Sequence, residues 1–261
     1  MNQVVPKLVI DGLNKQFKDL EVLTRVDATI EKGEFISIVG PSGCGKTTFL
    51  RIVSGLEQAS GGRVLLDGRL VEKPGYDRGF VFQQDNLLPW RTILNNAMIG
   101  PEIGGFAGSA QLKATRRLLK LVGLEGFEDY YPKQLSGGMR QRVNLARALA
   151  VDPEILLMDE PFSALDAQTR EIMQTELLRI WEEGRKTVLF VTHQIDEAVF
   201  LSDRVFVFAR RPGRLQEVID IDLPRPRSLS IKRTPEFVAL VDRIWGLIEH
   251  EVRKSVMEEL E

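Results

Sequence analysis

The amino-acid sequence predicts an α/β fold with a mainly parallel sheet, because short apolar runs alternate along the chain with segments of helical periodicity. The runs at residues 155–158 and 188–191 are apolar at every position, which is typical of strands that are buried on both faces of a sheet. From about residue 86 to residue 150 only helical periodicity appears. We therefore interpret that stretch as a helical insertion into the α/β core.

The individual elements follow from β-branched runs and from apolar residues at helical spacing. We expect strands at residues 7–10, 26–30, 35–39, 64–66, 79–82, 155–158, 188–191, 204–208 and 215–219. We expect helices at residues 46–53, 110–122, 137–149, 167–183, 194–201 and 236–260. The chain is then one domain with an α/β core at 1–86 and 151–234, a helical subdomain at 87–150 and a C-terminal helical tail at 235–261.

The composition argues against several classes of protein. The 261 residues carry 35 basic and 37 acidic side chains, a formal net charge of −2, which argues against a generally basic nucleic-acid coat but not against a local basic patch. A single cysteine cannot form an internal disulfide, which fits a reducing compartment. Residues 1–7 show no secretory signal, and no uncharged apolar stretch approaches the roughly 20 residues that span a bilayer. We expect a soluble intracellular protein that would need a partner for any work at a membrane.

The most informative motif lies between the predicted strand at 35–39 and the predicted helix at 46–53, and it matches the pattern G-x-x-x-x-G-K-[ST]. Its residues are Gly40, Pro41, Ser42, Gly43, Cys44, Gly45, Lys46 and Thr47, followed by Thr48. Glycines let successive backbone amides point into one concavity that holds phosphate oxygens at the positive end of the helix. We expect Lys46 to reach the β- and γ-phosphates and the Thr47 hydroxyl to bind Mg²⁺. A chance glycine turn is the alternative, and the flanking strand and helix favour a nucleotide site.

Two carboxylates, Asp159 and Glu160, follow the apolar strand at 155–158. Because the C-terminal ends of parallel strands form the mouth of such a site, we expect both beside the phosphate-binding loop. Asp159 suits the Mg²⁺ shell, and Glu160 is placed to polarise the attacking water. Surface capping by two acids is the alternative to this catalytic interpretation.

A second candidate anion site begins the predicted helix at 137–149. Ser136 is predicted as its N-cap, and Gly137 and Gly138 leave backbone amides open to an anion. From the residues alone, an ordinary helix cap is an equally good interpretation.

Together, these motifs resemble the ATP-binding cassette (ABC) ATPases in order and spacing, from about residue 8 to residue 215. The segment from Leu135 to Met139 looks like the family's signature sequence, and the segment from Ser163 to Asp166 resembles its D-loop. Other matching positions are Phe17 for the aromatic residue against adenine, Gln83 for the Q-loop and His193 for the switch histidine. The resemblance implies a P-loop NTPase core with an N-terminal antiparallel β region and an inserted helical subdomain.

The family resemblance further implies an ATPase that uses ATP and Mg²⁺ and works as a head-to-tail homodimer. Each ATP would lie between the phosphate-binding loop of one subunit and the Ser136 helix start of the other. Gln83 would sense Mg²⁺ and the γ-phosphate while linking the core to the helical insertion, and His193 would hold the γ-phosphate and the attacking water. A histidine after an apolar strand, taken alone, is more often structural.

The residues that the resemblance implies fall into three groups. Those implied as catalytic are Lys46, Gln83, Glu160 and His193. Those implied as nucleotide-binding are the phosphate-binding loop through Thr48 together with Phe17, Ser136, Gly137, Gly138 and Asp166. Those implied as metal-binding are Thr47, Gln83 and Asp159.

Within the family the chain resembles the import ATPases of nitrate, sulfonate, taurine and related small solutes. The segments that carry this likeness are residues 87–91, 158–166, 194–204, 209–214 and 223–227. The resemblance implies a cytoplasmic protein, peripheral on the inner face of the cell membrane, that drives transmembrane permease subunits and indirectly serves a periplasmic or extracellular solute-binding protein. No appended regulatory domain is expected after residue 234, and these motifs do not identify the solute.

Two other functions stay open. One is a soluble ABC ATPase that acts on nucleic acid, ribosomes or cofactor assembly, although the single cassette, the negative net charge and the segment 88–90 argue against it and against a nucleic-acid partner. The other is an ATP-dependent scaffold that never hydrolyses ATP, which Glu160 and His193 argue against.

Several conspicuous residues have two interpretations each. Trp90 follows the Q-loop, where the family receives a short helix of the membrane subunit, and core packing is about as compatible. The arginines at 210–214 fit an anionic partner or, better, a solvated turn around Pro212 and Gly213. We interpret the helix at 236–260 as amphipathic and packed on the core rather than as a membrane anchor, with His250 on its polar side. At Cys44 we expect the amide, not the sulfur, to face phosphate.

Overall fold

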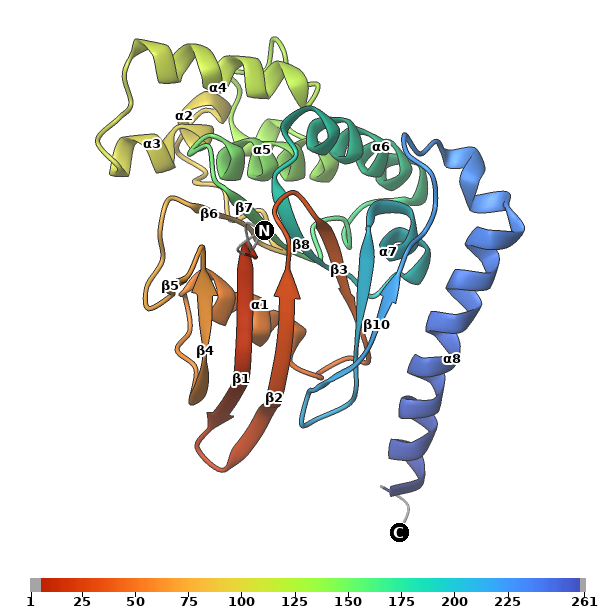
Figure 1. The fold of residues 1–261 in the computed structure, drawn as a ribbon. Coiled ribbons are helices and arrows are strands. Elements are labelled where there is room, and N and C mark those ends of the chain that lie inside the picture. Colours follow the sequence, from red (N-terminus) through yellow and green to blue (C-terminus); the bar gives the residue numbers. More distant parts are fainter. Residues whose placement is uncertain (1–5, 259–261) are drawn as a thin grey trace, which may run out of the picture. The chain divides into compact units, whose positions relative to one another are not determined.

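The computed structural model describes residues 6–258, which form two compact units. Unit 1 consists of the described residues up to Pro74 together with those from Thr187 onward, and unit 2 is the segment Gly75–Lys186. Unit 2 is therefore one continuous stretch of chain, whereas unit 1 is assembled from two stretches that are far apart in the sequence. Figure 1 shows the elements of both.

One part of unit 1 is an antiparallel sheet with the strand order β2-β1-β4-β5 (Figure 1). Its strands are β1 (Leu8–Phe17), β2 (Leu20–Ile30), β4 (Gly61–Leu66) and β5 (Arg69–Leu70). β1 and β2 are longer than the apolar runs that predict them. Buried and exposed side chains alternate along both strands, so about half of each strand is polar and the apolar runs mark only part of it. The sequence does not predict β5, since two residues show no strand periodicity.

The other strands of unit 1 pair around β3 (Phe35–Val39), which is parallel to β8 (Thr187–Val191) on one side and to β9 (Arg204–Phe208) on the other. β10 (Leu215–Asp220) pairs antiparallel with β9. Every residue of β3 and β8 is buried, and for residues 188–191 of β8 the unbroken apolar run predicts this burial. The helices of this unit are α1 (Lys46–Ser54), α7 (Ile195–Leu201) and α8 (Pro235–Glu258), with the 3₁₀ helix η2 (Leu229–Arg233) before α8.

Unit 2 contains the parallel strands β6 (Arg78–Val81) and β7 (Ile155–Asp159) and a group of helices. These are α2 (Ile93–Ala97), α3 (Ile99–Ile103), α4 (Ser109–Leu121), the 3₁₀ helix η1 (Pro132–Gln134), α5 (Gly137–Leu149) and α6 (Ala167–Gly184). The sequence does not predict α2 and α3, because five residues are too few to show helical periodicity. Residues 87–150, predicted as helical, lie within this unit. The parallel pairs, the N-terminal antiparallel strands and these helices confirm the predicted fold class.

The predicted amphipathic helix near the end of the chain is α8, which lies beside α7 in unit 1 (Figure 1). Phe237 and Ile244 are buried on one face, whereas Val238 and Trp245 are exposed. Positions 259 and 260 of the predicted helix, and positions 1–5 of the segment examined for a secretory signal, lie outside the described residues. Between residues 6 and 258 no helix is both long and apolar enough to cross a bilayer.

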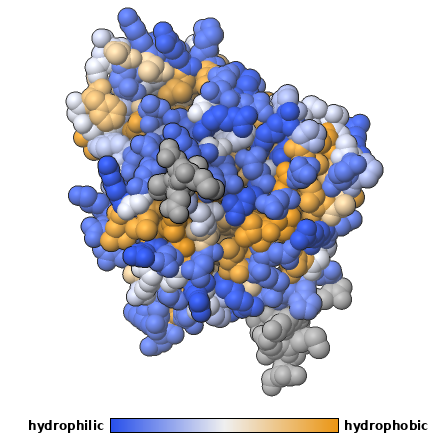
Figure 2. Space-filling model, in the orientation of Figure 1, coloured by the Kyte–Doolittle hydropathy of each residue, from blue (hydrophilic) through white to orange (hydrophobic). Residues whose placement is uncertain are grey.

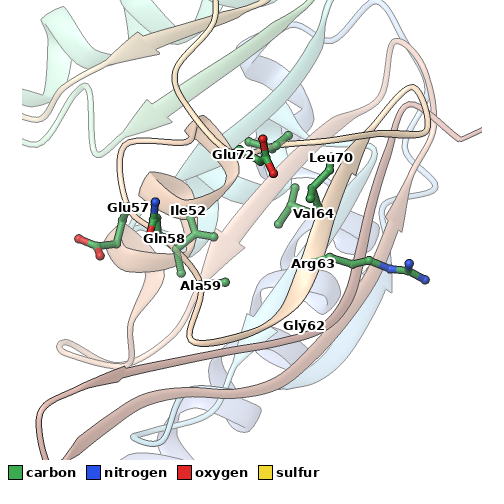
Figure 3. Close-up of a pocket in the computed structure, with 10 residues that line it drawn as sticks. Ile52, Glu57, Gln58, Ala59, Gly62, Arg63, Val64, Leu70 and Glu72 are labelled. Atoms are coloured by element: carbon green, nitrogen blue, oxygen red, sulfur yellow. The ribbon is translucent and has the colours of Figure 1, made fainter.

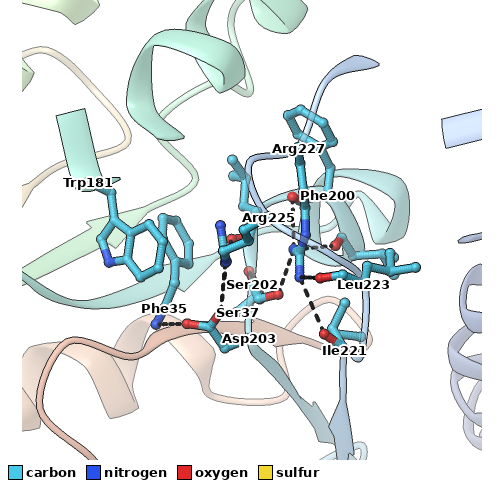
Figure 4. Close-up of polar contacts among 12 residues, drawn as sticks. Phe35, Ser37, Trp181, Phe200, Ser202, Asp203, Ile221, Leu223, Arg225 and Arg227 are labelled. Carbon is cyan, nitrogen blue, oxygen red and sulfur yellow. Dashed lines mark hydrogen bonds and ion pairs between the residues drawn. The ribbon is translucent and has the colours of Figure 1, made fainter. Parts of the chain in front are cut away.

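Arg227 caps the end of α7 from the segment that follows β10 (Figure 4). The residue is 6% exposed, and its guanidinium group donates to five carbonyl oxygens. The acceptors are Val199 at 3.1 Å, Phe200 at 3.0 Å, Ser202 at 2.7 Å, Ile221 at 3.3 Å and Leu223 at 3.2 Å. The last carbonyls of a helix have no partner within it, and a positive charge is favourable at that end. Arg227 therefore closes α7 and fixes the chain after β10 against it.

Arg225 and Asp203 extend this network to the start of β3 (Figure 4). Arg225 donates to one carboxylate oxygen of Asp203 at 2.8 Å and to the carbonyl oxygen of Leu201 at 2.8 Å. The second carboxylate oxygen of Asp203 accepts a hydrogen bond from the backbone amide of Phe35 at 2.9 Å. Two of the segments that carry the sequence resemblance, 194–204 and 223–227, thus pack on one another and on β3.

Replacing Arg227 with leucine should destabilise the fold, because five carbonyl groups would lose a shared buried donor. We expect the free energy of unfolding to fall by about 3 kcal/mol, or roughly 5–10 °C in the thermal midpoint followed by circular dichroism. The exposed Arg233→Leu in η2 is the matched control, and it should stay within about 0.5 kcal/mol of the wild type. Equal midpoints for the two variants would contradict the capping role.

Candidate nucleotide site

The phosphate-binding pattern forms the connection between β3 and α1 in unit 1, as predicted. Lys46 is buried at the first position of α1, and its ammonium group donates to the carbonyl oxygens of Gly40 at 2.8 Å and Pro41 at 3.0 Å. The loop therefore curls around its own lysine and holds a positive charge. Gly45 is the N-cap of α1 and has no side chain that could occupy the first amides of the helix, so this positive end stays available to an anion. These features fit the phosphate groups of a nucleotide.

Close packing against β9 holds the start of this loop. A Cβ atom on Gly40 would lie 2.5 Å from the carbonyl oxygen of Phe208, which leaves no room for any other residue type. The ring of Phe208 meets the ring of Phe49 in α1 edge to face, with centroids 5.4 Å apart. Packing thus demands glycine at position 40 independently of phosphate binding.

His193 leaves the sheet next to the phosphate-binding loop. In the parallel pair of β3 and β8, Ile38 lies opposite Val191. Gly40, the first residue of the loop, follows Ile38 by two positions, and His193 follows Val191 by two positions. Thr192 holds the turn that follows β8. Its amide donates to the carbonyl oxygen of Ile38 at 3.2 Å, and its hydroxyl bonds the buried carboxylate of Glu197. His193 itself is exposed, so it is not a core histidine.

Phe17 ends β1, and its ring is 43% exposed. The ammonium group of Lys15 lies 4.4 Å from the ring centroid, which orients the ring by a cation–π contact. An accessible aromatic ring is suited to stacking on a nucleotide base.

In unit 2, Gln83 and Glu160 are placed by a second parallel pair in the same way. Val81 of β6 lies opposite Met158 of β7. Gln83 follows Val81 by two positions, and Glu160 follows Met158 by two positions. The side-chain amide of Gln83 donates to a carboxylate oxygen of Glu160 at 3.1 Å, so the structure brings these two predicted site residues together. Asp159, between Met158 and Glu160, is buried. Glu160 has a φ of 45°, a left-handed conformation that is uncommon outside glycine and bends the chain at this point.

Two predicted site residues of unit 2 are helix N-caps. The Ser136 hydroxyl accepts from the amide of Met139 at 3.3 Å at the start of α5, where Ser136 and Gly137 are exposed. Asp166 begins α6, and its two carboxylate oxygens accept from the amide and the hydroxyl of Thr169 at 3.0 and 2.7 Å. These bonds hold the pKa of the Asp166 carboxyl below its usual range. The predicted cap at Ser136 is confirmed, and the start of α5 is open to an anion.

Sequence reasoning missed a row of polar side chains on α5 that holds the loop after β6, in which Gln83 lies. Asn144 donates to the carbonyl oxygen of Phe82 at 3.0 Å, and Arg147 donates to that of Asp85 at 2.7 Å. Arg140 forms an ion pair with the Asp85 carboxylate at 2.8 Å. The signal in the sequence is the spacing of three and four residues, which places these polar side chains on one face of the helix.

Cys44 lies inside the phosphate-binding loop with its thiol fully buried. Burial raises the pKa of this thiol, and the Lys46 ammonium, 3.8 Å from the sulfur, acts in the opposite direction without cancelling the effect. The sulfur is therefore protonated and shielded, which fits the expectation that phosphate would meet the backbone here rather than the thiol.

A separate hollow of about 430 Å³ lies in unit 1 between the end of α1 and strands β4 and β5 (Figure 3). Ile52, Val64 and Leu70 supply apolar walls, and Glu57 and Glu72 supply carboxylates. None of the predicted nucleotide-site residues lines it. It is therefore distinct from the site described above.

Exposed apolar side chains gather over α2–α4 of unit 2 in the view of Figure 2. In this part of the sequence Trp90 is 71% exposed and Ile103 is 77% exposed, and Phe106 and Leu112 are exposed as well. The exposure of Trp90 excludes core packing, one of its two interpretations, and is typical of an interface residue.

The chain is similar to known ATP-binding proteins over most of its length. Residues 23–163 match the family model described as ABC transporter. The chain is 52% identical over 254 residues to an uncharacterized ABC transporter ATP-binding protein of Methanocaldococcus jannaschii, covering 96% of this chain and 94% of the relative. It is 41% identical to an aliphatic sulfonates import ATP-binding protein of Bacillus cereus, covering 97% and 95%. Among solved structures, a dimeric ATP-binding cassette in a post-hydrolysis state with ADP and Pi has a TM-score of 0.72 at 34% identity, covering 83% of this chain and all of that one.

The buried thiol of Cys44 should resist alkylation in the folded protein, because the reactive thiolate is disfavoured by the raised pKa and access is blocked. At pH 7.5 we expect maleimide labelling at least about tenfold slower than at an exposed cysteine, and complete labelling in denaturant. The comparison is Ser230→Cys in a Cys44→Ser background, since position 230 is exposed. Mass spectrometry over time measures both rates, and equal rates would show that the loop does not bury its sulfur.

Proposed function

The chain belongs to the ABC transporter family of ATP-binding proteins, and on that premise we propose that it is the ATP-hydrolysing subunit of an importer for a small solute of the nitrate, sulfonate and taurine class. Its likeness to an aliphatic sulfonates import ATP-binding protein supports the solute class. The observation that carries ATP hydrolysis is Glu160, a carboxylate held by Gln83 at the end of β7 in a chain that also has a phosphate-binding loop.

The triphosphate of ATP binds the backbone amides at residues 40–48 and the Lys46 ammonium. The open N-terminal end of α1 and the buried positive charge support this assignment. Lys46 exchanges the carbonyl oxygens of Gly40 and Pro41 for β- and γ-phosphate oxygens. The exposed ring of Phe17 stacks on the adenine.

Thr47, Gln83 and Asp159 would hold Mg²⁺. Hydroxyl, amide and carboxylate oxygens are the ligands that this ion prefers in proteins. When bound, Mg²⁺ neutralises part of the charge on the β- and γ-phosphates.

Hydrolysis uses Glu160 as the base that takes a proton from the attacking water. The hydrogen bond from Gln83 keeps the Glu160 carboxylate oriented for this task. His193 holds the γ-phosphate and the water from the adjoining turn. Because phosphoryl transfer depends mainly on positioning and on stabilisation of charge, these residues account for most of the catalysis.

The site is completed by a second copy of the chain. The exposed start of α5, with Ser136, Gly137 and Gly138, binds the γ-phosphate of the nucleotide held by the other subunit. Asp166 lies at the same interface. The dimeric structure of a similar ATP-binding cassette supports a homodimer with two composite sites.

The partners are transmembrane permease subunits, and through them a solute-binding protein outside the cell membrane. The exposed Trp90 and the apolar side chains of the same unit provide a docking surface for a permease segment. With these partners the chain works at the inner face of the membrane, with ATP supplied from the cytoplasm.

Replacing Glu160 with glutamine should preserve ATP binding and lower the rate of hydrolysis by about 10²–10⁴-fold, because the general base is lost. Release of phosphate from the purified protein and calorimetric titration with ATP measure the two quantities. The matched control is Glu154→Gln, an exposed carboxylate next to the start of β7, which should hydrolyse ATP at the wild-type rate. A Glu160→Gln protein with near wild-type turnover would refute the role of this carboxylate.

A mixture of two inactive variants should test the composite site. A heterodimer of Lys46→Ala and Ser136→Arg subunits collects both lesions in one site and leaves the other site intact. In a Glu160→Gln background, which preserves bound ATP, we expect one occluded nucleotide per heterodimer and none in either homodimer. Filter binding with radiolabelled ATP measures the stoichiometry. A site built within one chain could not be rescued in this way, so zero occluded nucleotide in a demonstrated heterodimer would contradict the shared site.

A further inference from the structure

The connection between β9 and β10, here called the 210–214 loop, is joined to β2. The amide of Gly213 donates to the carbonyl oxygen of Val22 at 2.8 Å, and its own carbonyl oxygen accepts from the amide of Thr24 at 2.9 Å. Gly213 is buried, so the interpretation of this segment as a solvated turn is wrong at that residue, although Arg211 and Arg214 are exposed as expected.

Two residues of the 210–214 loop contact carbonyl groups of the phosphate-binding loop. The guanidinium group of Arg211 donates to the carbonyl oxygen of Gly43 at 3.4 Å. A Cβ atom on Gly213 would lie 1.9 Å from the carbonyl oxygen of Cys44, so only glycine lets the two backbones pack directly. The two contacts fall on the peptide units before and after Cys44.

These contacts orient the backbone amides of the phosphate-binding loop. In a planar trans peptide unit the carbonyl and the amide point in opposite directions, so fixing one fixes the other. Because the carbonyl group of Cys44 faces Gly213, the amide of Gly45 points away from the 210–214 loop. Successive amides of this kind are the groups that bind phosphate oxygens.

Glu251 of α8 holds the 210–214 loop from its other side. One carboxylate oxygen accepts from the backbone amide of Arg210 at 3.3 Å, and the other lies 3.9 Å from the guanidinium group of Arg214. Glu251 is 9% exposed. It shares a helix face with the buried Phe237 and Ile244, because residues seven apart return to nearly the same side of a helix. The face that packs α8 into unit 1 therefore also carries the carboxylate.

From this chain of contacts we infer that Glu251 and Arg211 are positioning residues for the phosphate-binding loop, and that α8 sets nucleotide affinity through the 210–214 loop. The inference rests on the proposed function, since it assigns both residues to the same nucleotide site. It gives a role to the arginine segment and to the C-terminal helix.

The first test measures ATP affinity and turnover separately. Glu251→Ala and Arg211→Ala should each raise the Kd for ATP about three- to tenfold, because the loop loses one constraint. Both variants keep Glu160, so their ATP hydrolysis can be assayed. Their KM for ATP should rise while kcat stays within about twofold of the wild type. Asp242→Asn, which removes an exposed carboxylate from α8, is the matched control and should leave the Kd unchanged.

Conservative variants and a double variant separate positioning from a general loss of stability. Arg211→Lys keeps a donor and Glu251→Gln keeps an acceptor for the Arg210 amide, so each should restore most of the affinity that its alanine variant loses. The double variant Glu251→Ala/Arg211→Ala should raise the Kd by less than the product of the single effects, because both residues act through one loop. Hydrogen exchange at the amides of residues 43–46 should be faster in the alanine variants without nucleotide.

The outcomes distinguish this inference from the proposed function. If the wild type binds no ATP, the proposed function fails and the inference fails with it. If the wild type binds ATP and the alanine variants match it in both Kd and hydrogen exchange, the inference alone is overturned. Should Glu251→Ala fail to fold, the Arg211 variants decide, since that side chain is exposed. An unchanged Kd for Arg211→Ala would then overturn the inference.

Discussion

The register of two parallel strand pairs sets where four groups of proposed site residues leave the sheet. In unit 1 the last registered pair of β3 and β8 is Ile38 with Val191. In unit 2 the last registered pair of β6 and β7 is Val81 with Met158. Side chains repeat along a strand with a period of two, and the phosphate-binding loop, His193, Gln83 and Glu160 all begin two residues beyond such a pair. A slip of one residue in either pair would change which residues of the two segments leave the sheet side by side. Every residue of β3, β7 and β8 is buried, so these strands are packed on both faces of the sheet.

Features that depend on a few neighbouring residues can be predicted from the sequence, and features that depend on distant partners cannot. The bounds of β3, β9 and α5, the N-cap at Ser136 and the position of the phosphate-binding loop all follow from local patterns. The full lengths of β1 and β2 do not follow from local patterns, because polar residues alternate with apolar ones and interrupt the apolar runs. The contact between Arg211 and Gly43 spans 168 positions of sequence, so no window around the arginines could show it. The roles of the site residues rest on residue chemistry and on family membership, and they stay proposals.

Three buried or half-buried arginines bind carbonyl groups where helices and loops end. Arg227 does so for α7, Arg170 for the turn before α6, and Arg147 for the loop after β6. A guanidinium group suits this task because it offers five donors in one plane and stays charged. Even Arg147, whose pKa burial lowers, remains a cation at neutral pH. These three arginines therefore have a structural role in holding the backbone.

The division of unit 1 into two distant stretches of chain has a consequence for synthesis. β3, which leads into the phosphate-binding loop, pairs with β8 and β9, and the bond from Gly33 to Thr187 joins residues 154 positions apart. While the ribosome makes the intervening chain, on the order of ten seconds or more at typical rates, the most apolar strand near the N-terminus has neither neighbour. Unit 2, Gly75–Lys186, lies wholly within that intervening stretch of chain. The apolar side chains of β3 therefore stay without either partner strand in the nascent chain until β8 and β9 emerge.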